Sequence, residues 1–420
     1  MVSPKIAEAL ERARQGAPLT DGYESLIAEI KTHPSPDTLK SDLRAVVDAI
    51  FGDQLGILKT RDLIIAVIDA LRALQNHDVW ISVGSHLVNL MTTYPNFSSL
   101  LEQSVTVREM IATAHEANED FLDAAKALAE IPLDSSQRRV PDTEKAAIWI
   151  RIVRNYLEVD DSTSAETYLN KLKNVMHNVD DPELNLHFRL SAGRIQDSNR
   201  QFLHASKTYH DLSFSPVIAE EERLHTLAMA IKCAILAPAG PARSRALGQL
   251  YKDERSAGLV EEYSILEKMF FDRLLSPAEV DKFAQGLAPH QLATTSDGST
   301  VLAKAVVEHN LLSASRLYTN IGFDELGLLL GLDGDKAEDT TAKMIEQGRL
   351  MGSIDQIDRI IWFEGGEASG EKGSGRAELP VGKEMRRWDG NVQALAEDVE
   401  RLTDALQAEF PEFVATQIAV

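Results

Sequence analysis

Histidine is the residue of this chain best suited to bind a catalytic metal, so its spacing is a first test for an active site. The sequence has 11 histidines, and the closest pair is His204 and His210. No pair therefore stands at the i+2, i+3 or i+4 spacing of a zinc enzyme, and neither HExxH nor His-x-His occurs. We therefore predict no metal site.

The other motifs that could support catalysis are also incomplete. Cys233 lies in the apolar run MAIKCAILA, which is typical of a buried thiol without an activating neighbour. No G-x-S-x-G motif occurs. Residues 365–372 have the glycines of a phosphate-binding loop, but Glu371 occupies the position of the required lysine. The prediction is a protein without catalytic, cofactor-binding or metal-binding residues, which is not an enzyme.

The net charge of the chain limits the classes of molecule that it can bind. Lys and Arg total 43 against 65 Asp and Glu, which gives a formal net charge of -22. Such a chain repels a phosphate backbone and favours basic or mixed-charge protein partners. The single cysteine excludes an internal disulfide and suits a reducing compartment. The most apolar run, residues 63–74, is interrupted by Asp69 and Arg72, so we expect no membrane span. The first residues, MVSPKIAEALERARQG, have no long apolar core and mix charges throughout, so we expect no secretory signal.

Most of the chain has the pattern of amphipathic helices. In the first hundred residues the helical pattern is broken by polar segments such as THPSPD. One helical face there consists of Leu39, Leu43, Val46, Val47 and Ile50.

A repeat is visible downstream of residue 115. Ala125, Ala165 and Ala205 stand 40 residues apart, and each is followed three or four residues later by a bulky residue. A small residue at a fixed place lets two helices approach closely, as stacked helical hairpins require. The spacing therefore predicts a right-handed solenoid similar to tetratricopeptide repeats.

Residues 308–364 change period twice. A helix ending near Ser315 precedes a short extended piece, in which we place Ile321 and Phe323 on one side, and two further helices follow. The chain then alternates as a hairpin around Asp358 and Arg359. Helix, strand, helix, helix, hairpin is the order of a winged-helix domain. The faces of its second and third helices consist of Phe323, Leu326, Leu329 and Leu330, and of Ala337, Thr341, Met344 and Ile345.

The last segment predicts a helix that needs a docking surface. Apolar residues there alternate spacings of three and four, the a/d pattern of a bundle helix. Burying five large side chains gains roughly 10 kcal/mol, whereas ordering about twenty residues costs at least ~20 kcal/mol of backbone entropy. The segment before it, GGEASGEKGSGRAELPVG, has the composition of a flexible linker. The five apolar residues are Val392, Leu395, Val399, Leu402 and Leu406.

Several of these stretches resemble a known family. NLLSASRLY, FDELGLLLGL, MIEQGRLMGSIDQID and the closing IIWFE look like the PCI module. This module ends subunits of the proteasome lid, the COP9 signalosome and a translation initiation factor. KDERSA, EKMFFDRLL and APHQLATTSDGSTVLAKAVVEHN make the likeness to the signalosome's PCI subunits the strongest. The long linker before the last helix departs from the family pattern.

The resemblance implies a mainly α protein: a helical-repeat solenoid, an α/β winged-helix domain and a C-terminal bundle helix. We expect an N-terminal helical-repeat arm at 1–115 and a solenoid with the PCI helical subdomain at 116–300. The winged helix would span 301–364, the flexible linker 365–384 and the bundle helix 385–420.

The resemblance also implies a role and partners. The chain would be a non-catalytic scaffold in the cytoplasm and nucleus, in a complex that removes the ubiquitin-like protein Nedd8 from cullins. Expected partners are other PCI subunits, metalloprotease-type subunits that carry the zinc, and a cullin-RING ligase contacted by the N-terminal arm. Tyr318, Ile321 and Ile361 are candidates for edge-to-edge contact between winged helices, although Ile321 and Phe363 could equally fill the domain's own core. Val392, Leu395, Val399, Leu402 and Leu406 are candidates for the bundle contact.

Two other functions stay open. One is the paralogous scaffold subunit of the 26S proteasome lid. The other is a nucleic-acid-binding winged helix, which the charge disfavours: residues 335–350 have acids at 335, 338, 339 and 346 against bases at 336, 343 and 349. We therefore expect neither nucleic acid nor membrane among the partners.

Overall fold

A computed structural model describes residues 3–15, 19–32, 38–53, 55–95, 97–134, 140–294, 298–364 and 381–411. The chain forms two compact units, Met1–Asn199 and Arg200–Val420. The predicted boundary between 115 and 116 lies inside the first unit, and the five-part division stays a prediction. Among the described helices, none is long and apolar enough to cross a bilayer.

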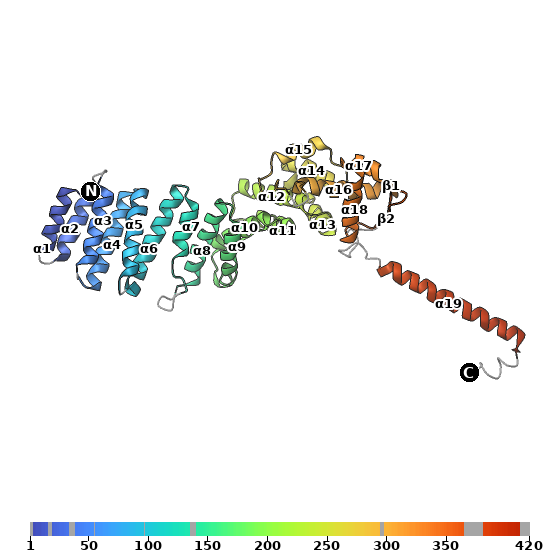
Figure 1. Ribbon diagram of the computed structural model, residues 1–420, viewed down its shortest axis with the longest axis horizontal. Helices are drawn as coiled ribbons and strands as arrows, with labels where there is room; N and C mark the ends of the chain where they lie inside the picture. The colour runs from blue at the N-terminus through green and yellow to red at the C-terminus, as the bar shows by residue number, and fades with distance from the viewer. Residues whose placement is uncertain are drawn as a thin grey trace. The chain divides into compact units, whose positions relative to one another are not determined.

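The first unit is a series of helices that pack on their neighbours along the chain (Figure 1). Its elements are α1 (Pro4–Gln15), α2 (Leu19–Thr32), α3 (Leu39–Gly52), α4 (Ile57–Leu74), α5 (His77–Thr93), η1 (Phe97–Leu100), α6 (Leu101–Ala117), α7 (Phe121–Ala129), α8 (Asp142–Glu158), α9 (Ser162–Lys173), η2 (Met176–Asn178) and α10 (Pro182–Ser198).

Local sequence signals set the ends of the later helices in this unit. Asp161 is the N-cap of α9 and accepts a 3.1 Å hydrogen bond from the backbone N of Ser164. Asp181 caps α10 by accepting from Glu183 N at 2.9 Å, with Pro182 at the first helical position. The turns before α7 and α9 contain Glu119 and Asp160, which have φ values of 64° and 58°. Equivalent turns thus recur from one hairpin to the next.

The alanine repeat marks the sites of closest packing. Ala125 in α7, Ala165 in α9 and Ala205 in α11 of the second unit are each 0% exposed. Within the first unit α7 packs on α6 and α8, and α9 packs on α8 and α10. The predicted helical repeats are therefore confirmed, because the small side chain stands where neighbouring helices crowd.

Polar pairs join successive hairpins of the first unit. Arg151 in α8 donates to Glu116 in α6, with Nη2 and Oε2 2.7 Å apart. Burial alone would raise the pKa of Glu116, but hydrogen bonds from Arg151 and Asn155 outweigh it and hold that pKa below its usual value. Arg194 in α10 donates to Glu158 in α8 at 2.9 Å. These pairs fix the register of one repeat on the next.

The second unit combines helices with one small sheet (Figure 1). Its elements are α11 (Phe202–Ser213), α12 (Glu220–Leu236), α13 (Pro241–Tyr251), η3 (Glu254–Gly258), α14 (Val260–Phe270), α15 (Pro277–Ala284), α16 (Val301–Leu317), β1 (Asn320–Gly322), α17 (Phe323–Leu330), α18 (Gly334–Glu346), β2 (Gly352–Asp355), β3 (Ile360–Phe363) and α19 (Val381–Glu409).

Elements α16 to β3 have the predicted winged-helix order. The antiparallel sheet has strand order β1-β3-β2, so β3 is central. One face of the sheet and the two helices enclose a core of Leu311, Phe323, Leu326, Leu330, Ala337, Met344, Ile361 and Phe363. One detail differs from the prediction: Phe323 begins α17 instead of following Ile321 in the strand, because α17 starts directly after the strand residue Gly322.

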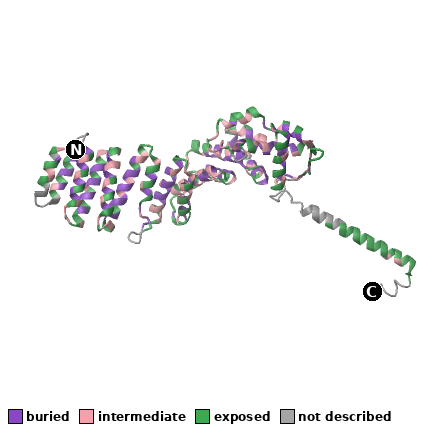
Figure 2. Ribbon diagram, in the orientation of Figure 1, coloured by how far each residue is buried: buried purple, intermediate pink, exposed green. Residues whose placement is uncertain are grey.

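The last helix is longer than predicted at its start and is exposed where its side chains are described. It begins at Val381 instead of 385. Figure 2 shows buried residues running through the helices of both units, whereas the described side chains of α19 are mostly exposed. The predicted linker lies largely outside the described residues, which resume at Val381.

Candidate assembly site

Helix α16 has a row of polar side chains on its buried side. Glu308, His309, Asn310 and Ser313 are between 0% and 6% exposed. Buried polar groups are costly unless each finds a partner. Their partners therefore show what this helix holds together.

Glu308 connects three segments that are far apart in the sequence. Its Oε1 accepts a 3.0 Å hydrogen bond from Arg349 Nη2, and its Oε2 pairs with Arg349 Nη1. Its Oε2 also accepts from the backbone N of Ala239 at 3.1 Å. Arg349 Nη1 in turn donates to the backbone oxygen of Ala239 at 3.3 Å. The bidentate pair thus fastens the end of the winged-helix segment after α18 to the loop after α12.

A second buried arginine, Arg243, also depends on the negative charge of Glu308. Arg243 is 2% exposed and donates to the backbone oxygen of Ala237 at 3.2 Å. Burial lowers the pKa of Arg243 to about 10, and the negative charges of Glu308 and Asp272 oppose that decrease. Arg243 therefore stays cationic near neutral pH and relies on these carboxylates for compensation.

His309 and Asn310 fasten the same helix to the segment after α14. His309 Nε2 lies 2.9 Å from the backbone oxygen of Arg273. Burial, reinforced by the charge of Arg243, lowers the pKa of His309 to about 3, so the ring is neutral. Asn310 accepts from Leu275 N at 3.0 Å and donates to Leu275 O at 3.3 Å. These bonds occupy both backbone groups of Leu275, as a neighbouring strand would.

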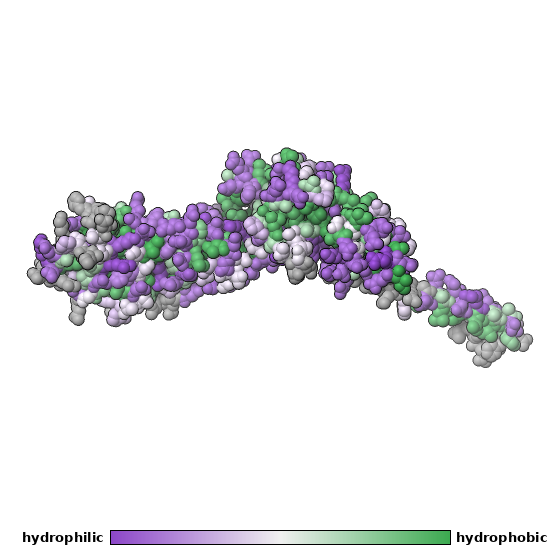
Figure 3. Space-filling view, turned by 45° about the horizontal axis from the view of Figure 1, so that its top comes forward, coloured by the Kyte–Doolittle hydropathy of each residue, from purple (hydrophilic) through white to green (hydrophobic). Residues whose placement is uncertain are grey.

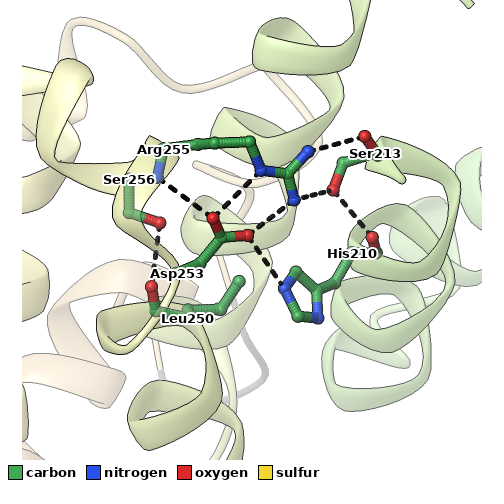
Figure 4. A network of polar contacts seen from close by, with 6 residues as sticks. All are labelled: His210, Ser213, Leu250, Asp253, Arg255 and Ser256. Carbon is green, nitrogen blue, oxygen red and sulfur yellow. Dashed lines mark hydrogen bonds and ion pairs between the residues drawn. The ribbon is translucent and has the colours of Figure 1, made fainter. Parts of the chain in front are cut away.

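A separate network joins α11 to η3 (Figure 4). Asp253 accepts from Arg255 through Nε at 3.0 Å and Nη2 at 2.6 Å, and His210 Nε2 lies 3.4 Å from its Oδ2. Arg255 also donates to the backbone oxygen of Ser213 at 2.7 Å. The side-chain hydrogen bond from Arg255 is the largest cause that holds the pKa of Asp253 below its usual value. This network gives the KDERSA stretch a structural role, because its Asp253 and Arg255 join η3 to α11.

The arrangement of these groups is structural. Within the described ranges, no group of three or more His, Cys, Asp or Glu side chains could hold a metal ion. On α16, Glu308 is paired with Arg349, and His309 lies at hydrogen-bond distance from the backbone oxygen of Arg273. What they achieve is to fix the winged helix on the helices before it, so that its edges are presented in a defined orientation.

The predicted edge residues fall in three different environments. Tyr318 is 44% exposed, just before β1, and Ile321 is half-buried on edge strand β1. Ile361, in contrast, is 0% exposed on the central strand. The prediction of Ile361 as a contact residue is therefore corrected: because β3 is bonded to a strand on each side, Ile361 fills the domain's own core.

The predicted bundle residues form a stripe along α19. Val392, Leu395, Val399 and Leu402 are 46%, 64%, 58% and 64% exposed, and Leu406 is half-buried. Trp388 extends the stripe and is 66% exposed. Figure 3 shows hydrophobic residues gathered along this helix. Their role in contact stays a prediction.

Sequence patterns did not identify the buried polar groups that join the winged helix to the preceding helices, which we call the joint. Glu308, Arg243 and Arg349 come from three elements, and periodicity says nothing about pairing over such separations. A usable signal was present: EHN places three polar residues in a row between the apolar pairs Val306-Val307 and Leu311-Leu312. Such a row breaks the amphipathic pattern and indicates buried polar contacts.

Two family models match the chain. The model described as PSMD12/CSN4, N-terminal, matches residues 5–221. The PCI domain model matches residues 280–364, which include α16 and the whole winged helix. The predicted PCI module is thereby confirmed.

The chain is also similar over nearly its whole length to curated proteins. It is 63% identical to COP9 signalosome complex subunit 4 of Neurospora crassa, with 99% of this chain and 98% of the relative covered. It is 48% identical to the protein of that name from Emericella nidulans, covering 96% and 97% of the two chains. The corresponding protein of Dictyostelium discoideum is 38% identical, with 94% of each chain covered.

Proposed function

Because this chain belongs to the family of COP9 signalosome complex subunit 4, we propose that it is a non-catalytic scaffold of that complex. In this role it supports the removal of Nedd8 from cullins through protein contacts alone. The isopeptidase zinc and its ligands belong to a metalloprotease-type subunit. The N-terminal arm, residues 1–115, reaches toward the cullin-RING ligase, and the complex works in the cytoplasm and nucleus.

The observation that carries the proposal is that buried polar groups and exposed apolar groups of the second unit have different roles. Its buried polar groups fix α16, and with it the winged helix, on the preceding segments: Glu308 accepts from Ala239 N and Asn310 accepts from Leu275 N. Its exposed apolar groups include Leu395 in the stripe of α19 and Tyr318 near the sheet edge. Exposed apolar surface of this kind is typical of contact with other proteins.

Removing residues 386–420 tests this function. We expect the truncated chain to keep helices α1 to α18 and to lose efficient entry into the complex, because the apolar stripe of α19 is gone. Affinity purification of tagged full-length and truncated chains, followed by quantification of the other signalosome subunits, measures the effect. Undiminished recovery of those subunits with the truncated chain would refute the scaffold role of α19.

The alternative assembly is the proteasome lid, whose subunits also carry PCI modules. The same purification decides between them, because proteasome subunits in place of signalosome subunits would identify the lid. A winged-helix nucleic-acid binder is the less favoured alternative: α18 carries Asp339 and Glu346 on its exposed surface. A salt-dependent mobility shift with duplex DNA at physiological ionic strength would support it.

A further inference from the structure

An open groove of about 620 Å³ lies between α18 and the β2–β3 hairpin, two elements labelled in Figure 1. Glu338 and Ala342 line it from the helix, and Ile354, Asp355 and Ile357 line it from β2 and the following turn. Trp362 of β3 completes the wall. In a nucleic-acid-binding winged helix, the helix in the position of α18 is the one that enters the DNA groove.

The charge of the groove is opposite to that of a DNA site. Two carboxylates, Glu338 and Asp355, belong to its lining, and no lysine or arginine does. The chain as a whole carries a formal charge of -22. Phosphates are repelled by such a groove, whereas lysine and arginine side chains are attracted to it.

The groove also exposes apolar side chains that the fold does not need. Ile357, in the turn between β2 and β3, is 94% exposed. Trp362 is 48% exposed and lies on the face of β3 opposite to the buried Ile361 and Phe363. Neither residue belongs to the core of the winged helix. Two such residues beside one groove offer an anchor point for an apolar side chain of a partner.

Hydrogen bonds hold the turn in place before any ligand arrives. Asp355 Oδ1 accepts from the backbone N of Ile357 at 3.0 Å and of Asp358 at 3.1 Å. The side chain of Gln356 donates through Nε2 to Glu338 Oε1, which ties the turn to α18. A preformed wall loses little conformational entropy on binding.

The edge of β2 sets the shape of the ligand. With strand order β1-β3-β2, β2 is hydrogen-bonded to β3 on one side, and its other edge is unpaired among the described strands. Backbone groups on such an edge can pair with an added extended segment. Ser353, Ile354 and Asp355 at β2 line the groove, so an extended segment bound there would lie along β2.

We propose that this groove binds an extended segment of a partner protein that carries lysine or arginine on either side of an aliphatic or aromatic residue. The basic side chains pair with Glu338 and Asp355, and the apolar side chain packs on Ile357 and Trp362. The inference rests on the proposed function only in taking the partner to be a protein. The site lies on β2, and the edge contact predicted from the sequence lies near β1.

Methyl NMR of the full-length chain tests the proposal, because Ile354 and Ile357 are both labelled by isoleucine δ1-methyl groups. The probe is a short synthetic peptide that alternates lysine and leucine, and its twin has glutamate in place of lysine. We expect the lysine peptide to shift the methyl signals of Ile354 and Ile357 and to leave that of the buried Ile148 in the first unit unchanged. The glutamate twin is expected to shift none of them.

Three variants locate the binding energy without disturbing the core. Ile357→Asp removes an anchor that is almost fully exposed. Glu338→Lys reverses one charge, and Asp355→Asn removes the other while its side-chain oxygen still accepts from the turn. Each should weaken peptide binding at least about tenfold. Glu144→Lys, on α8, is the matched charge control and should bind as the parent does.

Several results would reject the groove proposal without affecting the proposed scaffold function. Shifts spread over both units, equal binding by the glutamate twin, or unchanged affinity in all three variants would overturn the proposal. Preferential shifts with a duplex DNA oligonucleotide would overturn it in favour of a nucleic acid. Normal recovery of the signalosome with the parent chain, combined with no peptide binding, would reject the groove and leave the scaffold function intact.

Discussion

Glu308 shows how a single buried carboxylate can decide the orientation of a domain. It is 3% exposed and compensates Arg349 directly and Arg243 at longer range. Replacing only one member of a buried ion pair leaves an uncompensated charge. We therefore expect Glu308→Ala to lower the free energy of unfolding of the second unit by about 3–5 kcal/mol.

Urea unfolding followed by circular dichroism measures this effect. The matched control is Glu261→Ala in the same unit, where the pair with Lys282 has side chains 75% and 69% exposed. That change should cost less than about 1 kcal/mol. Equal losses in the two variants would contradict the assignment of Glu308 to the joint.

His309 predicts a pH dependence in the same helix. Folding lowers its pKa from 6.5 to about 3, chiefly through burial. The unfolded chain therefore binds a proton between these pH values and the folded chain does not. The stabilising contribution of the neutral ring is fully present above pH 6.5 and is lost as the pH falls toward 3.

His309→Gln removes that proton linkage while a side-chain amide can still donate to Arg273 O. We expect the free energy of unfolding of the parent to fall more steeply between pH 6 and pH 4 than that of the variant. The difference should approach about 1.4 kcal/mol per pH unit. Parallel pH profiles for the two proteins would show that the ring is protonated without penalty.

At the scale of helices, the repeat alanine gives a direct test of close packing. Ala165 is 0% exposed in α9, which packs on α8 and α10. Ala165→Leu adds volume where no space exists and should destabilise the first unit by about 1–3 kcal/mol. The matched control is Ala147→Leu on the exposed side of α8, which should change stability by less than about 0.5 kcal/mol. Thermal unfolding of both variants measures the difference.

The elements themselves were predictable because their signals are local. Ala125, Ala165 and the period changes around Phe323 are visible within windows of a few residues, and the structure places them as expected. Contacts between elements that are distant in the sequence are not visible in such short windows. Ile361 was predicted at an edge because a strand pattern does not state its neighbours, and strand order makes it central. Glu308 and Arg349 were missed for the same reason, since a salt bridge between distant elements leaves no periodic trace.

For the whole molecule, buried polar contacts and exposed apolar stripes have complementary roles. The contacts of α16 make the winged helix a fixed part of the second unit. The stripe of α19 has the opposite character, since it exposes large apolar side chains over a helix of 29 residues. A helix of this kind is marginal in water without a partner surface. We therefore expect the stripe to become buried when the chain assembles with its partners.

A single charge on that stripe should separate assembly from folding. Leu395→Asp places a carboxylate on the apolar stripe, and we expect it to reduce recovery of the other signalosome subunits at least about tenfold, because an interface core tolerates an unpaired charge poorly. Gln393→Asp adds the same charge off the stripe, where the side chain of Gln393 donates to the exposed Glu397, and recovery should be unchanged. The melting temperature of the two units should be the same in both variants, because Leu395 is 64% exposed in the free chain.

Equal recovery with both variants would mean that the stripe is not the contact surface. A lowered melting temperature for Leu395→Asp would mean that the stripe belongs to the fold.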